Sequence, residues 1–366
     1  MAKRNHPKHR KSLPLILLKT IGRLLLFIII LVAGMLLFLT ITEYKPDPAE
    51  SLTVSEGGEK ALQTGDSIKA VSWNIGYGAL GDNADFFMDG GTGVRTADAE
   101  RLDTNLSAIL SFLQESGADV YLLQETDRNS ARSGNIDETQ RIAQGLPGYS
   151  STFGNNFKVP FIPYPLPPIG KVDSGILTLS RYPIESADRL SLPCPFSWPL
   201  RIANLKRCLV VNRIPLSDSG HELVLVNLHL EAYDSGEGKE AQTKQMMELL
   251  QKEADAGNYV IAAGDFNQTF SNIDTSMYPE YEGMWMCGRI DTGEYENTWQ
   301  FAMDNSVPSC RSLDKPYADA DKSTFQYYLI DGFILSKNIS VESLETVDLG
   351  FVHSDHNPVV LNAVLE

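Results

Sequence analysis

Polar residues that can do chemistry recur in this chain where short apolar segments end. Asn74 and Glu125 each close one such segment, and Asp265 and Asn267 close a third. In an extended chain the two-residue period places Asp265 and Asn267 on one face, with Phe266 on the other. Carboxylate and amide groups in such positions are suited to a shared ligand, so these segment ends are candidate parts of one polar site.

Two further segments carry polar groups that are costly to bury. One segment alternates so that Asn227 and His229 share a face, while its other face is wholly apolar. Asn227 is either a substrate contact or a group that only satisfies a strand end. Asp331 interrupts another apolar segment, where a carboxylate is unfavourable unless it is paired or hydrogen-bonded. His356, on a turn before the last apolar segment, is a natural partner for Asp331.

The apolar patterns that carry these residues indicate interleaved strands and helices from residue 67 onward. Strands are predicted at 67–77, 119–125, 174–184, 208–216, 222–231, 258–267, 326–336 and 358–365. Two long helices are predicted at 99–117 and 238–257, the first with Asp98 as N-cap and Gly117 as its end. This mixture predicts a sheet-based α/β domain over residues 67–366.

Six short motifs follow one another along this domain. They are Trp73-Asn74, Gln124-Glu125, Asn227–Leu230, Gly264–Asn267, Ile330–Gly332 and Ser354–His356. No single motif is decisive, although Gly264–Asn267 is rarer than the others, but the ordered set resembles the endonuclease/exonuclease/phosphatase superfamily of DNase I-like phosphoesterases. The resemblance covers about residues 68–366. It implies a four-layer α/β sandwich of two packed, mostly antiparallel sheets flanked by helices, with the site at one end.

The resemblance also implies a metal site. Glu125 would be the principal ligand of a divalent cation, normally Mg²⁺, with Mn²⁺ or another divalent ion as the alternative. Asn74 and Asp355 would support that site. Oxygen donors with few carboxylates suit a hard cation that keeps several of its waters.

Catalytic roles follow from the same resemblance. Asp265 and Asn267 would face the attacking water and a phosphoryl oxygen. His356, oriented by Asp331, would act as general base or phosphate clamp. His229 would bind a phosphoryl oxygen of the substrate or protonate the leaving group. Whether Asp265 or His356 takes the proton of the water stays open.

The N-terminal region has the composition of a membrane anchor. Residues 24–42 are uncharged and almost wholly apolar, and a helix of this length reaches about 28 Å, close to the thickness of a bilayer core. A cleaved signal peptide is the alternative, but this run is longer than such a segment and lacks a small-residue cleavage pattern. The basic segment 1–23 is therefore predicted to be cytoplasmic, followed by one transmembrane helix, a tether at 43–66 and an extracytoplasmic domain.

The charge balance bears on the substrate. The chain has 31 Lys and Arg residues against 47 Asp and Glu residues, and the first acidic residue is Glu43. An acidic domain argues mildly against a long nucleic acid, which binds mainly through Lys and Arg contacts with phosphates. We expect a small or lipid-borne phosphoester as substrate. An extracytoplasmic nuclease and a non-catalytic, membrane-anchored binding module are the alternatives, and no protein partner can be inferred.

Three other features bear on the environment of the domain. The four cysteines could form disulfides in an oxidising compartment or remain buried thiols. They are Cys194, Cys208, Cys287 and Cys310.

The proline-rich stretch 157–175 is expected to be a long loop, either a rigid wall or a lip facing substrate or a bilayer. Asn267 begins a glycosylation sequon inside the proposed site, which favours a bacterial cell envelope over a eukaryotic secretory lumen.

Overall fold

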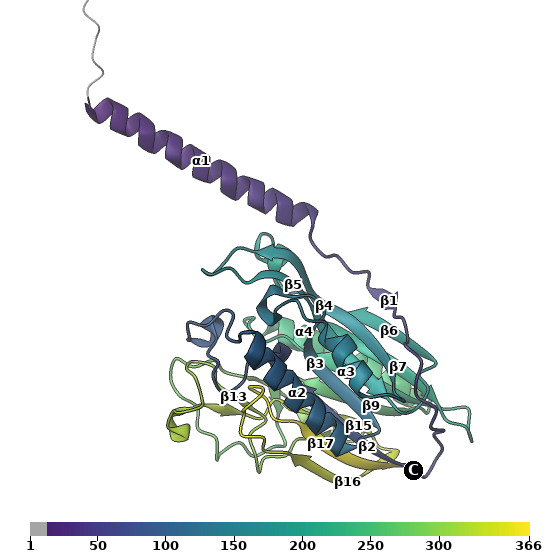
Figure 1. Ribbon diagram of the computed structural model, residues 1–366. Helices are drawn as coiled ribbons and strands as arrows, with labels where there is room; N and C mark the ends of the chain where they lie inside the picture. The colour runs from purple at the N-terminus through teal and green to yellow at the C-terminus, as the bar shows by residue number, and fades with distance from the viewer. Residues whose placement is uncertain (1–12) are drawn as a thin grey trace, which may run out of the picture. The chain divides into compact units, whose positions relative to one another are not determined.

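The N-terminal part of the chain is a single long helix. The computed structural model describes residues 13–366, and these form two compact units, the first ending at Glu43 and the second comprising residues 44–366 (Figure 1). Helix α1, Leu13–Ile41, begins well before the predicted membrane segment at 24–42. It is long and apolar enough to cross a membrane. The first part of the predicted cytoplasmic segment, residues 1–12, lies outside the described residues.

Two large sheets form the second unit, as the α/β sandwich prediction requires. One sheet has the strand order β1-β6-β7-β8-β9-β15-β12, and the other has the order β16-β17-β2-β3-β5-β4. In these two sheets neighbouring strands run antiparallel except for the parallel pairs β2–β3 and β8–β9. The sandwich is therefore mostly antiparallel, as predicted.

The strand bounds are as follows. The first sheet contains β1 Ala49–Ser51, β6 Ser186–Ser191, β7 Cys208–Pro215, β8 Glu222–His229, β9 Tyr259–Asp265, β15 Asp331–Ser336 and β12 Trp299–Ala302. The second contains β16 Ile339–Thr346, β17 Val359–Leu365, β2 Ser67–Asn74, β3 Val120–Asp127, β5 Gly170–Ser180 and β4 Ser150–Ile162. Two short pairs complete the set, β10 Gln268–Phe270 with β11 Gly288–Ile290, and β13 Cys310–Arg311 with β14 Tyr327–Tyr328.

Helices cover the outer face of each sheet. Helices α2, Ala99–Ser116, and α3, Glu138–Gly145, pack their apolar sides on the second sheet, and α4, Glu237–Asp255, packs on the first (Figure 1). Helix α2 begins as predicted, because the Asp98 side chain accepts a hydrogen bond from the Arg101 backbone N–H. It also ends as predicted, at Gly117 in the left-handed conformation.

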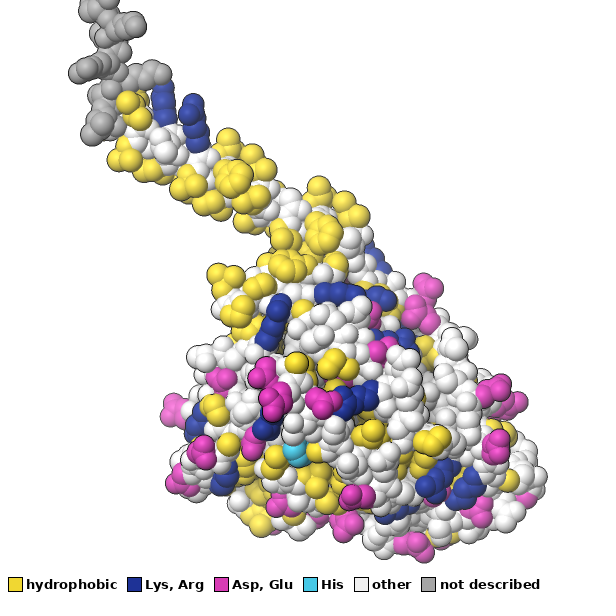
Figure 2. All heavy atoms as spheres, in the orientation of Figure 1, with side chains coloured by type: hydrophobic (Ala, Val, Ile, Leu, Met, Phe, Trp, Pro, Cys, Tyr) yellow, Lys and Arg dark blue, Asp and Glu magenta, His cyan; other side chains and the backbone are white. Residues whose placement is uncertain are grey.

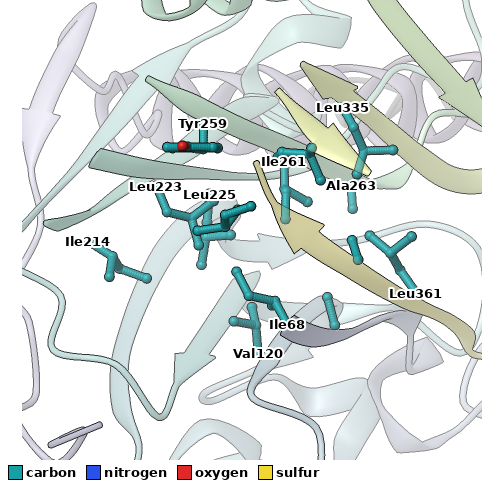
Figure 3. Close-up of a cluster of buried hydrophobic side chains, with 14 of the residues drawn as sticks. Ile68, Val120, Ile214, Leu223, Leu225, Tyr259, Ile261, Ala263, Leu335 and Leu361 are labelled. Carbon is teal, nitrogen blue, oxygen red and sulfur yellow. The ribbon is translucent and has the colours of Figure 1, made fainter. Parts of the chain in front are cut away.

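The main core fills the space between the two sheets. Ile68 and Val120 project from one sheet towards Leu225 and Ile261 of the other, and all four are almost completely buried (Figure 3). The face of β8 that carries Leu225 also carries Asn227 and His229. The packing of this core therefore sets the positions of the strand ends that bear the predicted site residues.

Two segments differ from the loops expected for them. The predicted loop 157–175 is wrong, because β4 continues to Ile162 and β5 begins at Gly170. Pro160 is tolerated in β4 because this strand lies at the sheet edge, where a missing N–H breaks no ladder bond. In the segment 43–66, β1 pairs with β6 and residue Leu62 is buried, so much of this stretch lies against the domain.

All four cysteines are free thiols in this structure. Cys208 and Cys310 are buried, and Cys194 and Cys287 are partly buried. Burial raises the pKa of the Cys208 thiol to about 11. The buried sulfurs therefore behave as small apolar groups.

Candidate active site

The residues predicted from the motifs meet at one end of the sandwich. Strand β8 ends at His229 and β9 at Asp265, while the antiparallel β15 begins at Asp331. The strand register places Asp265 directly between His229 on one neighbouring strand and Asp331 on the other. The second sheet adds Asn74, the last residue of β2. The site is thus assembled from both sheets, and in the first sheet from the parallel strands β8 and β9 together with the antiparallel strand β15.

Asp265 lies at the centre of this arrangement. Its Oδ2 atom accepts a hydrogen bond from Asn74 Nδ2 at 3.0 Å and lies 3.3 Å from His229 Nε2. Its Oδ1 atom accepts a hydrogen bond from the Asn267 backbone N–H at 2.9 Å. Burial, together with the nearby carboxylate of Asp331, raises the pKa of Asp265 to about 7. A carboxylate with this pKa can accept a proton from water near neutral pH.

His356 lies beside Asp265 and contacts Asp331, the partner expected from the sequence. His356 Nδ1 is 2.8 Å from Asp331 Oδ2, and His356 Nε2 is 3.8 Å from Asp265 Oδ2. Burial disfavours the charged imidazolium, but the Asp331 carboxylate outweighs burial and raises the pKa of His356 well above its ordinary value. The ring is therefore a cationic hydrogen-bond donor at the site.

His229 differs from His356 in its charge state. Burial, followed by the positive charge of Arg207, lowers the pKa of His229 well below its ordinary value. Its Nδ1 atom is buried and has no hydrogen-bond partner. The two imidazoles therefore differ in charge: the neutral ring can donate a hydrogen bond, whereas the cationic ring can also give up a proton.

Two site residues have unusual backbone conformations. Glu125 and Asn267 both have φ near 51°, in the left-handed region that residues other than glycine rarely adopt. Strand β3 is also irregular in its pairing with β5 at Glu125. The Asn267 side chain donates a hydrogen bond to the Leu230 carbonyl at 2.9 Å. Backbone strain of this kind concentrates at functional sites, where it directs a side chain.

The three residues predicted to bind a metal have the chemistry that a hard cation requires. Asn74 Nδ2 lies 3.3 Å from Glu125 Oε1, so these two side chains are adjacent. Burial raises the pKa of Asp355 to about 6, and the nearby Glu125 carboxylate adds to the increase. A divalent cation bound by both carboxylates would remove their repulsion. The donor set of Glu125, Asn74 and Asp355 therefore fits Mg²⁺ or a similar ion.

Asn227 does not reach this site. Its side chain is completely buried between the sheets and donates hydrogen bonds to the Leu177 carbonyl at 3.0 Å and to Thr178 Oγ1 at 3.2 Å. Its Oδ1 atom accepts a hydrogen bond from Gln124 Nε2 at 2.9 Å. These contacts join β8 to the opposite sheet. We therefore interpret Asn227 as a structural residue, in place of the substrate contact considered above.

Replacing Asn227 by alanine should lower stability more than activity. The substitution removes the acceptor of one Gln124 Nε2 N–H, although Nε2 keeps its hydrogen bond to the Leu122 carbonyl. An unpaired buried group of this kind costs about 1–3 kcal/mol in the free energy of unfolding. Turnover by the protein that remains folded should stay close to that of the parent. Denaturant unfolding and a phosphodiesterase assay below the unfolding transition measure the two effects. A stable Asn227→Ala variant with greatly reduced turnover would restore the substrate-contact interpretation.

Two contacts at the site had no signal in the sequence. Cys310 pairs with His356 through a β-bridge, and its sulfur lies within 4.8 Å of ligand atoms of Asp355 and His356. The Tyr233 hydroxyl donates a hydrogen bond to Asp89 Oδ1 at 3.0 Å. Burial raises the pKa of Asp89 to about 7. Both contacts join segments that are distant in the sequence, so neither local patterns nor motifs could predict them.

The sequence model of the Endonuclease/Exonuclease/phosphatase family matches residues 71–356. The chain belongs to this family. The match includes every site residue from Asn74 to His356. Members of the family are metal-dependent phosphoesterases, so this family member is a divalent-metal-dependent phosphoric ester hydrolase. Among curated proteins, no sequence matches the chain.

Solved structures with the same fold have diverged far in sequence. An endonuclease/exonuclease/phosphatase from Beutenbergia cavernae is 18% identical with a TM-score of 0.53, over 82% of this chain and 72% of that one. A mannosyl-6-phosphatase from Bacteroides thetaiotaomicron is 14% identical with a TM-score of 0.52, over 81% and 99%. The human Nocturnin catalytic domain with bound sulfate is 17% identical with a TM-score of 0.50, over 86% and 98%. At these identities the likeness shows the shared fold alone.

Proposed function

We propose that this protein is a membrane-anchored, Mg²⁺-dependent phosphoesterase that cleaves a small or lipid-borne phosphoester by attack of water. The observation that carries the proposal is the environment of Asp265. This one carboxylate lies within 3.8 Å of Asn74, His229 and His356 side-chain nitrogens and accepts a backbone hydrogen bond as well. A buried carboxylate surrounded by donors, next to a cation site, can both orient and deprotonate a water molecule.

Glu125, Asn74 and Asp355 would hold the Mg²⁺. When bound, the ion supplies neutralisation of charge on the phosphoryl oxygens and stabilisation of the leaving oxygen. The chain contributes the positioning: Asn74 contacts both the Glu125 and Asp265 carboxylates, at 3.3 and 3.0 Å. Asn74 thus couples the cation site to the group that activates water.

The remaining residues act on the water and the phosphoryl group. Asp265 takes the proton of the attacking water, because the Asp331 contact keeps His356 protonated. His356 and Asn267 donate hydrogen bonds to phosphoryl oxygens, where negative charge grows in the transition state. The neutral His229 donates a ring N–H hydrogen bond to a phosphoryl oxygen and lies 3.3 Å from Asp265. The leaving oxygen takes its proton from solvent, or from Asp265 after that carboxylate has received the proton of the water.

Glu125→Gln should weaken Mg²⁺ binding more than it affects any other property of the enzyme. The substitution removes the charge that binds a hard cation while the side chain keeps its shape. The Mg²⁺ concentration for half-maximal rate should rise by at least about 10-fold, the range reported for disturbed metal sites. Titrating Mg²⁺ against rate for both proteins measures the shift. An unchanged half-saturating Mg²⁺ concentration would show that Glu125 is not a ligand of the metal.

The membrane anchor is proposed to be α1, with the catalytic unit outside the cytoplasm. Seven Lys and Arg residues precede residue 24, and no acidic residue precedes Glu43. Short basic flanks of this kind remain on the cytoplasmic side. Asn267 is 6% exposed and bonded within the site, so a glycan there is incompatible with activity and we favour a bacterial envelope.

The substrate class is tested most simply by a panel of phosphoesters. The full chain in vesicles would be assayed with Mg²⁺ against phospholipid diesters, soluble sugar phosphates and double-stranded DNA. We expect the highest kcat/KM for a small or lipid-borne phosphoester, because the domain is acidic and duplex binding depends on cations. Preferred cleavage of DNA would support the nuclease alternative. Inactivity on the whole panel, in a folded protein that binds Mg²⁺, would support the binding-module alternative.

A further inference from the structure

Exposed apolar side chains gather on two segments of the catalytic unit. Tyr164 and Leu166, in the β4–β5 turn, are 71% and 86% exposed, and Trp198 and Leu200, between β6 and β7, are 55% and 68% exposed. We name these four side chains the apolar lip. The β4–β5 hairpin projects from the body of the unit, and apolar side chains gather at that end (Figures 1 and 2). Clustered apolar exposure of this extent is typical of a surface that contacts another phase or molecule.

The segment that carries Trp198 and Leu200 is fixed to β4, the strand that leads into the turn with Tyr164 and Leu166. The short helix η4, Leu200–Ala203, packs against β4. The Lys206 backbone N–H donates a hydrogen bond to the Asn156 carbonyl in β4 at 2.6 Å. Arg189 reinforces the connection, since it donates hydrogen bonds to the carbonyls of Asn155 at 2.7 Å and Lys206 at 2.8 Å. The lip is therefore held by ordered contacts.

The backbone of the lip carries few hydrogen-bond donors. The segment 163–169 has prolines at four of its seven positions, and the segment 193–199 has prolines at three. Each proline lacks an N–H group. Because an unpaired N–H is costly to transfer into a medium poor in water, these segments enter a bilayer interface at lower cost than an ordinary loop.

The chain itself connects the lip to the membrane helix. The Ser191 backbone N–H donates to the Pro48 carbonyl at 2.9 Å, and the Ser191 hydroxyl donates to the Asp47 carbonyl at 2.8 Å. Ser191 ends β6, directly before the segment that carries Trp198. Only residues 42–46 separate the end of α1 from Asp47, and such a stretch reaches at most about 20 Å.

The lip is also continuous with the mouth of the active site. The Tyr164 ring meets the Phe87 ring edge-on, with centroids 6.1 Å apart. Two residues later, Asp89 is bonded to Tyr233, on the loop that follows His229. These contacts therefore connect the lip with the loop that follows His229.

We propose that the apolar lip inserts into the interfacial region of the same bilayer that α1 spans, and thereby presents the active-site mouth to the membrane. The proposal rests on the proposed function, specifically on membrane anchoring by α1. Its occupant is the lipid surface, because the short connection to α1 leaves this edge of the domain beside a bilayer. Since the domain is acidic and the lip is apolar, the contact should form on zwitterionic lipid and persist at high salt.

Trp198 is a natural reporter of this insertion. Trp73 and Trp299 are each 1% exposed, whereas Trp198 is 55% exposed. The full chain would be reconstituted into phosphatidylcholine vesicles whose acyl chains carry bromine close to the glycerol, and insertion of α1 would be verified by resistance to alkaline extraction. The emission lost on replacing Trp198 by Phe isolates the signal of this residue. We expect that signal to be strongly quenched by brominated lipid, because interfacial side chains reach the boundary of the acyl region.

Matched variants separate insertion from nonspecific changes. Leu166→Glu should relieve the quenching of Trp198 and should slow hydrolysis of a vesicle-borne phosphoester without affecting a soluble one. Met277→Glu, at a side chain that is 61% exposed outside the lip, should change neither property.

An extraction-resistant chain whose Trp198 is not quenched would overturn the proposal that the lip inserts, while the proposal that α1 is the anchor would stand. A chain that is released by alkaline extraction would overturn the anchor and the lip together. Quenching that is absent at high protein density and appears only when the protein is diluted in lipid would show that a second copy of the chain covers the lip, and would overturn the proposal.

Discussion

Replacing Asp265 by asparagine should reduce turnover by at least about 10²-fold, the usual contribution of a positioned general base. Asparagine has nearly the same shape and can still accept the hydrogen bond that Oδ1 receives from the Asn267 backbone N–H. It cannot accept a proton from water. Steady-state rates at saturating Mg²⁺, measured on a simple activated phosphodiester, give the effect. The half-saturating Mg²⁺ concentration should change far less than the rate.

The matched control for this variant is Asn74→Asp, which alters the side chain that bridges Asp265 and Glu125. It adds a negative charge beside the cation site, so it should change Mg²⁺ affinity and rate together. If the folded Asp265→Asn variant turned over at near the parental rate, the proton of the water would have another acceptor, and His356 would be the next candidate.

Replacing His356 by alanine should also cost about 10²–10³-fold in turnover, the cost of removing one charged donor to a developing oxyanion. The ring is held by the Asp331 contact at 2.8 Å, so its orientation does not depend on substrate. Asp331→Asn should give a smaller loss of the same kind, because Asp331 orients the ring and keeps it protonated but does not itself contact the phosphoryl group. The rates are compared with those of the parent under the same Mg²⁺ saturation.

Loss of the ring could also unfold the protein, since Asp331 is buried and one of its oxygens already has no hydrogen-bond partner. Breaking a buried ion pair costs several kcal/mol. His356→Gln is therefore the second variant, because its amide can still donate to Asp331. A thermal melt establishes that each variant is folded. Near-normal turnover by either folded variant would show that His356 does not bind the reacting phosphoryl group.

Much of the site was predictable because its residues lie where regular patterns end. Asp265 and Asn267 follow a buried strand, and Asp331 is a carboxylate in an apolar context that demands a partner. The contact of Asp331 with His356 follows from this requirement. Helix α2 was equally predictable, because its apolar face and both of its caps are local features of the sequence.

The parts that could not be predicted depend on distant contacts. Asn227 and His229 share one face of β8, yet only His229 lies far enough along the strand to leave the core, and no local pattern marks that boundary. Strand β4 was not predicted because Pro160 disfavours a strand except at a sheet edge. The local sequence does not show which strand lies at an edge. The Tyr233 contact with Asp89 joins residues 144 positions apart and likewise has no local signal.

Removal and return of the divalent ion is the most direct test of metal-assisted hydrolysis at this site. The full chain, in detergent or vesicles, would be treated with a chelator, assayed on an activated phosphodiester, and assayed again after Mg²⁺ is restored, with Asp265→Asn carried through in parallel. We expect hydrolysis to stop on chelation and to return with Mg²⁺ in the parent only, because Glu125, Asn74 and Asp355 are then again able to bind the ion. Hydrolysis that continues in the chelator, or that returns equally in Asp265→Asn, would contradict metal-assisted hydrolysis at this site.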